Sequence, residues 1–231
     1  MTDVLKNMIV QGYVEIFKKN DKNARYAKYA LIAIVLFGLS YGGFHAYRYY
    51  ISKREAAAQK QFSLCMKELE QARSGIGSWH DVEVAFKAAY RQSSQSQLAP
   101  YILTFEAEAL SQQGKDKEAI AVFSKGLEKI KKASDLYGLY SVKLALMKLD
   151  MKDAALQQEG IATLEKIACV NQACEPSSGT AVALYMLGSY YWDKNNMDKA
   201  KQAWQKLVSL ESQGYESPYI RVAQEKLEQI A

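Results

Sequence analysis

The sequence is poor in the residues that most enzymes use for catalysis or metal binding. It contains only two histidines and three cysteines in 231 residues. His45 lies in an apolar segment and His80 at a predicted helix start, and neither neighbours other groups spaced for a metal ion or a nucleophile. No glycine-rich phosphate-binding loop is present. We therefore expect a non-enzymatic protein with no metal ion and no cofactor.

Closely spaced carboxylates do not change this expectation. Glu106 and Glu108 are two residues apart, as are Glu68 and Glu70. Residues at that spacing lie on different sides of a helix. Both pairs are therefore interpreted as solvated surface.

Proline is also scarce, and most of the chain has no excess of charge. Three prolines and 13 glycines, with abundant Ala, Lys, Glu and Gln, are typical of an all-α protein. The net charge of +5 comes from residues 1–55, which hold 9 Lys and Arg against 4 Asp and Glu. Residues 56–231 hold 21 of each. A neutral domain of roughly 175 residues does not suit nucleic acid, so we expect no such partner.

What the sequence does have is one long apolar run. From Tyr29 to Tyr47 there is no Asp, Glu, Lys or Arg, and Lys28 and Arg48 flank the run. A helix of this length covers about 28 Å, close to the hydrocarbon core of a bilayer. Tyrosines at both ends suit the interface with lipid head groups. We predict a transmembrane helix at 29–50.

Two alternatives to an anchor are a buried helix of a soluble domain and a signal peptide. Buried helices rarely lack charge over this length. A signal peptide has a shorter lead and a shorter apolar core, and His45-Ala46-Tyr47 is a poor cleavage site. We expect the helix to stay in the mature protein. Gly38 and Gly42 form a GxxxG motif, so homodimerisation through this motif is an alternative to an ordinary pair of membrane glycines.

The segment 1–28 is basic and weakly amphipathic. It is either a helix lying on anionic lipid or a partly disordered lead whose lysines set the topology. Five Lys or Arg precede the apolar run within about 20 residues, and four follow it. This difference does not decide the orientation.

The rest of the chain, 51–231, has a continuous helical pattern that contains repeats. Residues 181–214 match the 34-residue tetratricopeptide pattern of two antiparallel helices. The small residues that let the paired helices touch are Gly188 and Ala200, and the large ones include Leu184 and Trp204. The alternative is an ordinary helical bundle with chance spacing. We predict an all-α fold, with one N-terminal transmembrane helix followed by a tetratricopeptide-like α-solenoid.

Two further repeats begin at Pro100 and Ser141. The repeat from Ser141 is degenerate, because Lys148 and Gly160 occupy its small positions. The repeat starts are more than 34 residues apart, and we place the extra residues at 132–140 and 169–179. Ser217-Pro218 is predicted to open a final helix that runs to Ile230 and covers the last repeat.

The cysteines give a conditional prediction. Cys169 and Cys174 lie in one loop between repeats and form a disulfide if the compartment is oxidising, or remain two thiols if it is reducing. Two cysteines alone are a weak zinc signal. Cys65 falls on an apolar stripe and is expected to pack as a small hydrophobe.

In tetratricopeptide stacks, the first helix of each repeat lines a concave groove. Five positions of that helix point into it, and their aromatic and polar side chains would suit an extended or helical protein segment. The predicted groove residues of the two better repeats are Tyr101, Thr104, Glu108, Ser111, Gln112, Val182, Tyr185, Ser189, Trp192 and Asp193. The degenerate repeat adds Val142, Ala145, Leu149, Lys152 and Asp153. The alternative is that Tyr185 and Trp192 pack against the final helix.

This layout resembles a known family. The stretch YVEIFKKNDKNARYAKYALIAIVLFG at 13–38, the run 100–130 and its entry AAYRQSSQSQLAPYILTFEAEAL at 88–110 are similar to the ancillary subunits of the bacterial Sec translocon. Those proteins join a short basic N-terminus, one membrane helix and a tetratricopeptide-like periplasmic domain. The chain departs from them in its longer N-terminus and in the Cys169–Cys174 loop.

The resemblance implies a single-pass protein of the bacterial inner membrane, with a cytoplasmic N-terminus and a periplasmic C-terminal domain. Its partners would be the translocon and periplasmic chaperones or foldases, which the tether would hold at high local concentration. The alternative function is an anchored assembly factor for another envelope complex, such as cytochrome maturation or outer-membrane protein insertion.

Overall fold

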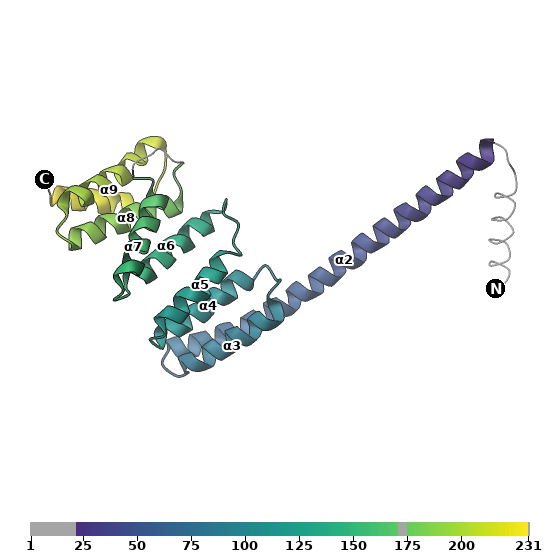
Figure 1. The fold of residues 1–231 in the computed structure, drawn as a ribbon, viewed down its shortest axis with the longest axis horizontal. Helices are drawn as coiled ribbons and strands as arrows, with labels where there is room; N and C mark the ends of the chain where they lie inside the picture. The colour runs from purple at the N-terminus through teal and green to yellow at the C-terminus, as the bar shows by residue number, and fades with distance from the viewer. Residues whose placement is uncertain (1–21, 171–174, 231) are drawn as a thin grey trace. The chain divides into compact units, whose positions relative to one another are not determined.

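The computed structural model describes residues 22–170 and 175–230, and within them every regular element is helical (Figure 1). These residues form nine α-helices and one short 3-10 helix, and no strand is found among them. The predicted all-α class is confirmed. The chain divides into two compact units, residues 1–56 and 57–231, which are described separately below.

The first unit contains the N-terminal part of α2, a helix that runs from Lys22 to Arg73. α2 is long and apolar enough to cross a membrane, and none of its apolar window is buried by other described residues. Phe37, for example, is 74% exposed. The serine hydroxyl of the apolar run is satisfied inside the helix, because the Ser40 Oγ donates to the Leu36 carbonyl at 2.8 Å. The predicted membrane helix is therefore present as a helix, with its apolar side chains uncovered.

The second unit consists of the end of α2 and eight further α-helices. α3 and α4 follow at Trp79–Ser93 and Ala99–Gln112, and α5 and α6 at Asp116–Leu127 and Asp135–Leu149. The remaining helices are α7 at Ala154–Ala168, α8 at Ser178–Asp193, α9 at Met197–Ser209 and α10 at Pro218–Glu228, with the 3-10 turn η1 at Glu211–Gln213.

Several helix starts are fixed by side-chain caps. The Ser78, Ser177 and Ser217 hydroxyls accept backbone N–H groups at the starts of α3, α8 and α10. The helix start at Ser217 was predicted from sequence and is confirmed. At the other end of α2, Gly75 adopts the left-handed conformation (φ 78°), which lets the chain leave that helix and turn toward α3.

Helices that are neighbours in sequence pack on one another, and α6 also packs on α8. Three buried clusters result. The first joins the end of α2 to α3 and α4 around Phe86. The second joins α4, α5 and α6 around Phe123, and the third joins α6 to α10 around Trp204. Because α4 and α6 each contribute to two clusters, the core is continuous along the unit.

The structure corrects the sequence analysis at the middle repeat. α6 begins at Asp135, so most of the predicted extra residues at 132–140 belong to this helix. Gly160 is buried at the crossing of α6 and α7, where a Cβ would come within 2.7 Å of the Ala145 carbonyl oxygen. Lys148 is accommodated because its Nζ reaches the Glu159 carboxylate at 2.8 Å. The pair α6–α7 is therefore closely packed despite its unusual sequence.

Candidate functional site

The predicted groove residues of α4 lie in varied surroundings. Tyr101 is half-buried beside Tyr140, with ring centroids 6.5 Å apart. Thr104 is buried, and its hydroxyl donates to the Pro100 carbonyl at 2.9 Å. Glu108 accepts a 2.5 Å hydrogen bond from Arg73 of α2. Thr104 is thus a packing residue, whereas Tyr101 and Glu108 keep part of their surface.

At the end of α4, two predicted groove residues are accessible to a partner. The Ser111 hydroxyl lies 3.3 Å from Asp116 Oδ1, which ties the end of α4 to the start of α5. Gln112 is exposed. With Tyr101 and Glu108 they give α4 a polar and aromatic side that is only partly covered.

The predicted groove residues of α8 are largely engaged with the end of the chain. The Tyr185 and Tyr219 ring centroids are 5.1 Å apart. The Trp192 ring lies 5.7 Å from that of Trp204, and the Lys226 ammonium lies 5.4 Å from the Trp192 centroid. Since Tyr219 and Lys226 belong to α10, this helix covers both aromatic side chains.

Of the other three predicted residues of α8, only Asp193 presents an exposed charged side chain. Val182 is half-buried, and the Ser189 hydroxyl donates to the Tyr185 carbonyl at 3.1 Å. Asp193 is exposed at the end of the helix.

The degenerate repeat contributes few accessible groove side chains. Val142 and Ala145 of α6 are buried, and Leu149 is half-buried. Lys152 is exposed after the helix, and the Asp153 carboxylate caps α7 by accepting from two backbone N–H groups. Of the predicted groove positions, those on α4 are therefore the best placed to meet a partner.

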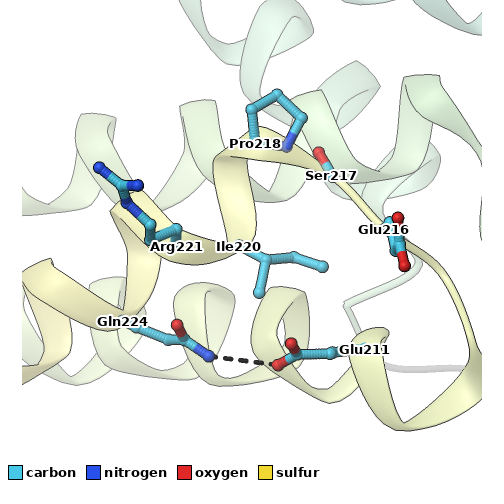
Figure 2. A pocket seen from close by; sticks show the side chains of 7 residues that line it. All are labelled: Glu211, Glu216, Ser217, Pro218, Ile220, Arg221 and Gln224. Atoms are coloured by element: carbon cyan, nitrogen blue, oxygen red, sulfur yellow. Dashed lines mark hydrogen bonds between the residues drawn. The ribbon is translucent and has the colours of Figure 1, made fainter.

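A cavity of about 630 Å³ lies between η1 and α10, and the sequence analysis did not predict it (Figure 2). Figure 2 shows Ile220 in its middle, with Ser217 and Pro218 on one side and the Glu211–Gln224 pair on the other. The Gln224 Nε2 donates to Glu211 Oε2 at 3.2 Å. The cavity has an apolar centre and a polar rim, but no group in it is buried and left without a partner.

A second hollow, of about 420 Å³, lies between α7, α8 and α9. The Tyr191 hydroxyl donates to Glu165 Oε1 at 2.7 Å across it. Burial and this carboxylate both raise the pKa of Tyr191 far above its ordinary value. The Lys199 ammonium lies over the same ring, 4.9 Å from its centroid. The phenol is therefore a neutral hydrogen-bond donor that joins two helices.

No group of three or more His, Cys, Asp or Glu side chains is placed to hold a metal ion in the described part of the chain. His80 lies at the start of α3, with Nδ1 3.9 Å from a Glu83 carboxylate oxygen. His45 is exposed on α2 and lies against Tyr41.

The cysteines occupy two kinds of site. Cys65 is buried in the first cluster as a free thiol, as expected, and burial raises its pKa. Cys169 ends α7 in the left-handed conformation (φ 48°), and its sulfur is disulfide-bonded. Cys174 lies outside the described residues, so the pairing of Cys169 with Cys174 stays a prediction.

One interpretation of the sequence analysis is wrong. Glu106 was assigned to solvated surface, but it is only 6% exposed, in the interface of α4 with α3 and α5. The helical spacing could have predicted the burial of Glu106. Glu106 follows Leu103 by three residues and precedes Leu110 by four, and both leucines are buried. Its partner in that interpretation, Glu108, binds Arg73 instead.

No family model matches this chain, and no curated protein matches it in sequence.

Proposed function

We propose that this chain is a non-enzymatic, membrane-tethered protein-interaction module that serves the Sec translocon by linking it to periplasmic chaperones. The observation that carries the proposal is the uncovered apolar part of α2. The C-terminal part of the same helix packs into the first buried cluster of the helical unit. An apolar helix of this length that no other described residue covers is stabilised by lipid. The helical unit that follows supplies surface for protein partners.

We also propose that the helices after residue 57 form a tetratricopeptide-like α-solenoid. The support is the stacking order: α6 packs on α7 and also on α8, so the pairs α6–α7 and α8–α9 touch through their first helices. The repeat positions Gly188 and Trp204 meet at the crossing of α8 and α9. In such a stack the first helices line one face, and α4 offers Tyr101, Glu108 and Gln112 there.

The proposed location is the bacterial inner membrane, with the N-terminus in the cytoplasm and the helical unit in the periplasm. Reporter fusions at each terminus test it, using an enzyme that is active only in the periplasm and a fluorescent protein that matures only in the cytoplasm. Activity of the periplasmic reporter at the N-terminus would contradict this orientation.

The function is tested by site-specific photocrosslinking in cells that express the full chain. A photoreactive residue at Gln112 of α4 should crosslink to translocon subunits or to chaperones. The same residue at Lys201 of α9, which is also exposed, is the matched control and should not. Crosslinks from Gln112 to cytochrome-maturation or outer-membrane-insertion proteins would favour the alternative function, an assembly factor for another envelope complex.

A further inference from the structure

A group of four cations lies along the seam between α3 and α5. Lys87 and Arg91 are one turn apart on α3, Lys125 lies near the end of α5, and Lys129 lies in the turn that follows α5. All four are exposed, and α4 packs against both helices beneath them. We call these four residues the basic seam.

An aromatic ring holds the two sides of the basic seam together. Tyr90 of α3 is half-buried, and the Lys125 and Lys129 ammonium groups lie 4.7 and 5.8 Å from its ring centroid. The Lys129 Nζ also donates to the Ser94 carbonyl at 3.4 Å. Lys125 of α5 and Lys129 of the following turn therefore reach across to α3, and the four cations converge on one place.

Beneath the basic seam lies Glu106, a carboxyl group that is more than nine-tenths buried. Among the described residues no hydrogen bond or ion pair satisfies it. The charged groups close enough to act on it are Lys87, Arg91 and Glu83 of α3 and Lys125 of α5. Glu83 is itself held by Lys115 at 2.8 Å, and its Oε1 lies 3.9 Å from the Lys87 Nζ, so one carboxylate is shared between these two lysines. The seam thus keeps a local positive charge, in a unit whose Lys and Arg otherwise balance its Asp and Glu.

The shape and charge of this surface favour one kind of occupant. A positive site on a neutral domain attracts a negative ligand. An extended peptide can place carboxylates beside cations of both helices and contact the half-buried Tyr90 ring that lies between them. We propose that the basic seam binds an acidic segment of a partner protein, whose carboxylates pair with Lys87, Arg91, Lys125 and Lys129 above the Glu106 carboxyl.

This proposal rests on the proposed function only in that the helical unit binds proteins. It does not depend on which membrane complex the chain serves. The basic seam is formed by α3 and α5, whereas the proposed groove residues lie on α4 and α8, so the two surfaces can be tested separately.

Binding at the seam has a consequence for protonation. A carboxylate that approaches the seam disfavours the ionised form of Glu106, whose pKa burial already raises. The hydrogen bond from Lys115 lowers the pKa of Glu83, so Glu83 stays ionised. Binding is therefore coupled to uptake of a proton at Glu106, and protonation of Glu106 as the pH falls strengthens binding.

The experiment measures binding of fluorescein-labelled oligoglutamate to the full chain in nanodiscs of zwitterionic lipid, by fluorescence anisotropy. Lys125→Gln with Lys129→Gln should weaken binding about three- to tenfold, and more strongly at low salt. Glu106→Gln should strengthen binding at pH 7 and change the dependence of affinity on pH relative to the wild type, because the titration of the peptide itself is common to both proteins. The matched control, Lys166→Gln with Lys201→Gln, removes two exposed lysines of α7 and α9 and should leave affinity unchanged.

Three outcomes would overturn the proposal. Equal loss in the control variant would show attraction to net charge alone. Vesicles of anionic lipid that bind through Lys125 and Lys129, while oligoglutamate does not bind, would assign the seam to lipid. Salt-dependent self-association that these substitutions abolish would assign it to a second copy of the chain. A normal melting temperature of each variant confirms that folding is intact, and none of these results bears on the crosslinking test of the proposed function.

Discussion

At the residue scale, two buried glutamates of neighbouring helices have opposite electrostatic surroundings. Glu83 of α3 accepts hydrogen bonds from Lys115 at 2.8 Å and from Gln113 at 3.0 Å, which lower its pKa. Glu106 of α4 is buried without such donors, and burial raises its pKa above the ordinary value of 4.5. Residue type alone does not separate these two cases.

The two glutamates predict opposite effects of pH on stability. Because the pKa of Glu106 is raised in the folded protein, ionised Glu106 destabilises the fold once the pH rises through that pKa. Glu106→Gln should therefore raise the melting temperature at pH 7 by a few degrees, and the increase should be smaller near pH 4.5. Because the pKa of Glu83 is lowered in the folded protein, ionised Glu83 stabilises the fold at any pH above its ordinary pKa. Glu83→Gln should therefore lower the melting temperature at pH 7, and the decrease should be smaller in acid. Circular dichroism melts across this range measure both, and parallel behaviour of the two variants would contradict the assignment.

A second prediction at this scale concerns Gly188. A Cβ at this position would meet the indole ring of Trp204, which is 1% exposed and cannot move aside. Gly188→Ala should therefore destabilise the fold by about 1–3 kcal/mol, although Ala is the better helix former. Gly138→Ala is the control, since its Cβ would make only an ordinary 3.4 Å contact with Gly179. Equal urea midpoints for the two variants would refute close packing at Gly188.

At the element scale, α10 acts as a cover for α8. Tyr185 and Trp192 lie against Tyr219 and Lys226 of this helix. A role as free groove residues requires both aromatic side chains to be dispensable for stability, whereas these contacts predict that they are needed.

Tyr185→Ala combined with Trp192→Ala should lower the melting temperature by about 4–8 °C, from a loss of about 2 kcal/mol of packing. Val84→Ala, at a side chain that is 50% exposed, should change it little and serves as the control. An unchanged melting temperature together with lost crosslinking would restore Tyr185 and Trp192 to the groove. Differential scanning fluorimetry of the three proteins is sufficient.

Much of the element order could be predicted from the sequence because its signals are local. The apolar run of α2, the serine caps at Ser78 and Ser217, and the Gly188–Trp204 spacing each depend on a few neighbouring residues. The exposure of groove side chains could not be predicted, because it depends on contacts between helices. α10 covers Trp192, and α3 and α5 bury Glu106.

At the scale of the whole molecule, the two compact units predict that the second folds without the first. Deletion of residues 1–50 removes the apolar window but leaves the buried cluster around Phe86 complete, from Cys65 onward. The fragment should be soluble, monodisperse and helical by size-exclusion chromatography and circular dichroism. Aggregation of this fragment, while the full chain is well behaved in detergent, would contradict the division.

The compartment of the second unit is tested by its thiols. In the periplasm, Cys169 and Cys174 should be oxidised to each other while Cys65 stays a buried thiol. Mass mapping of native protein, alkylated without reduction, distinguishes the three cysteines. Alkylation at both Cys169 and Cys174 would exclude the disulfide. It would also remove the evidence that the second unit lies in an oxidising compartment.

The order of packing has a consequence for how the chain acquires its structure during synthesis. Helices that touch are almost always neighbours in sequence, so each can dock on its predecessor as soon as it emerges from a narrow channel. Because the contacting residues are close in sequence, closing each contact costs little chain entropy. The unit is therefore expected to fold fast and from its N-terminal end. A chain that folds stepwise in this way exposes its apolar surfaces only briefly. It therefore needs little help from the chaperones that we propose it recruits.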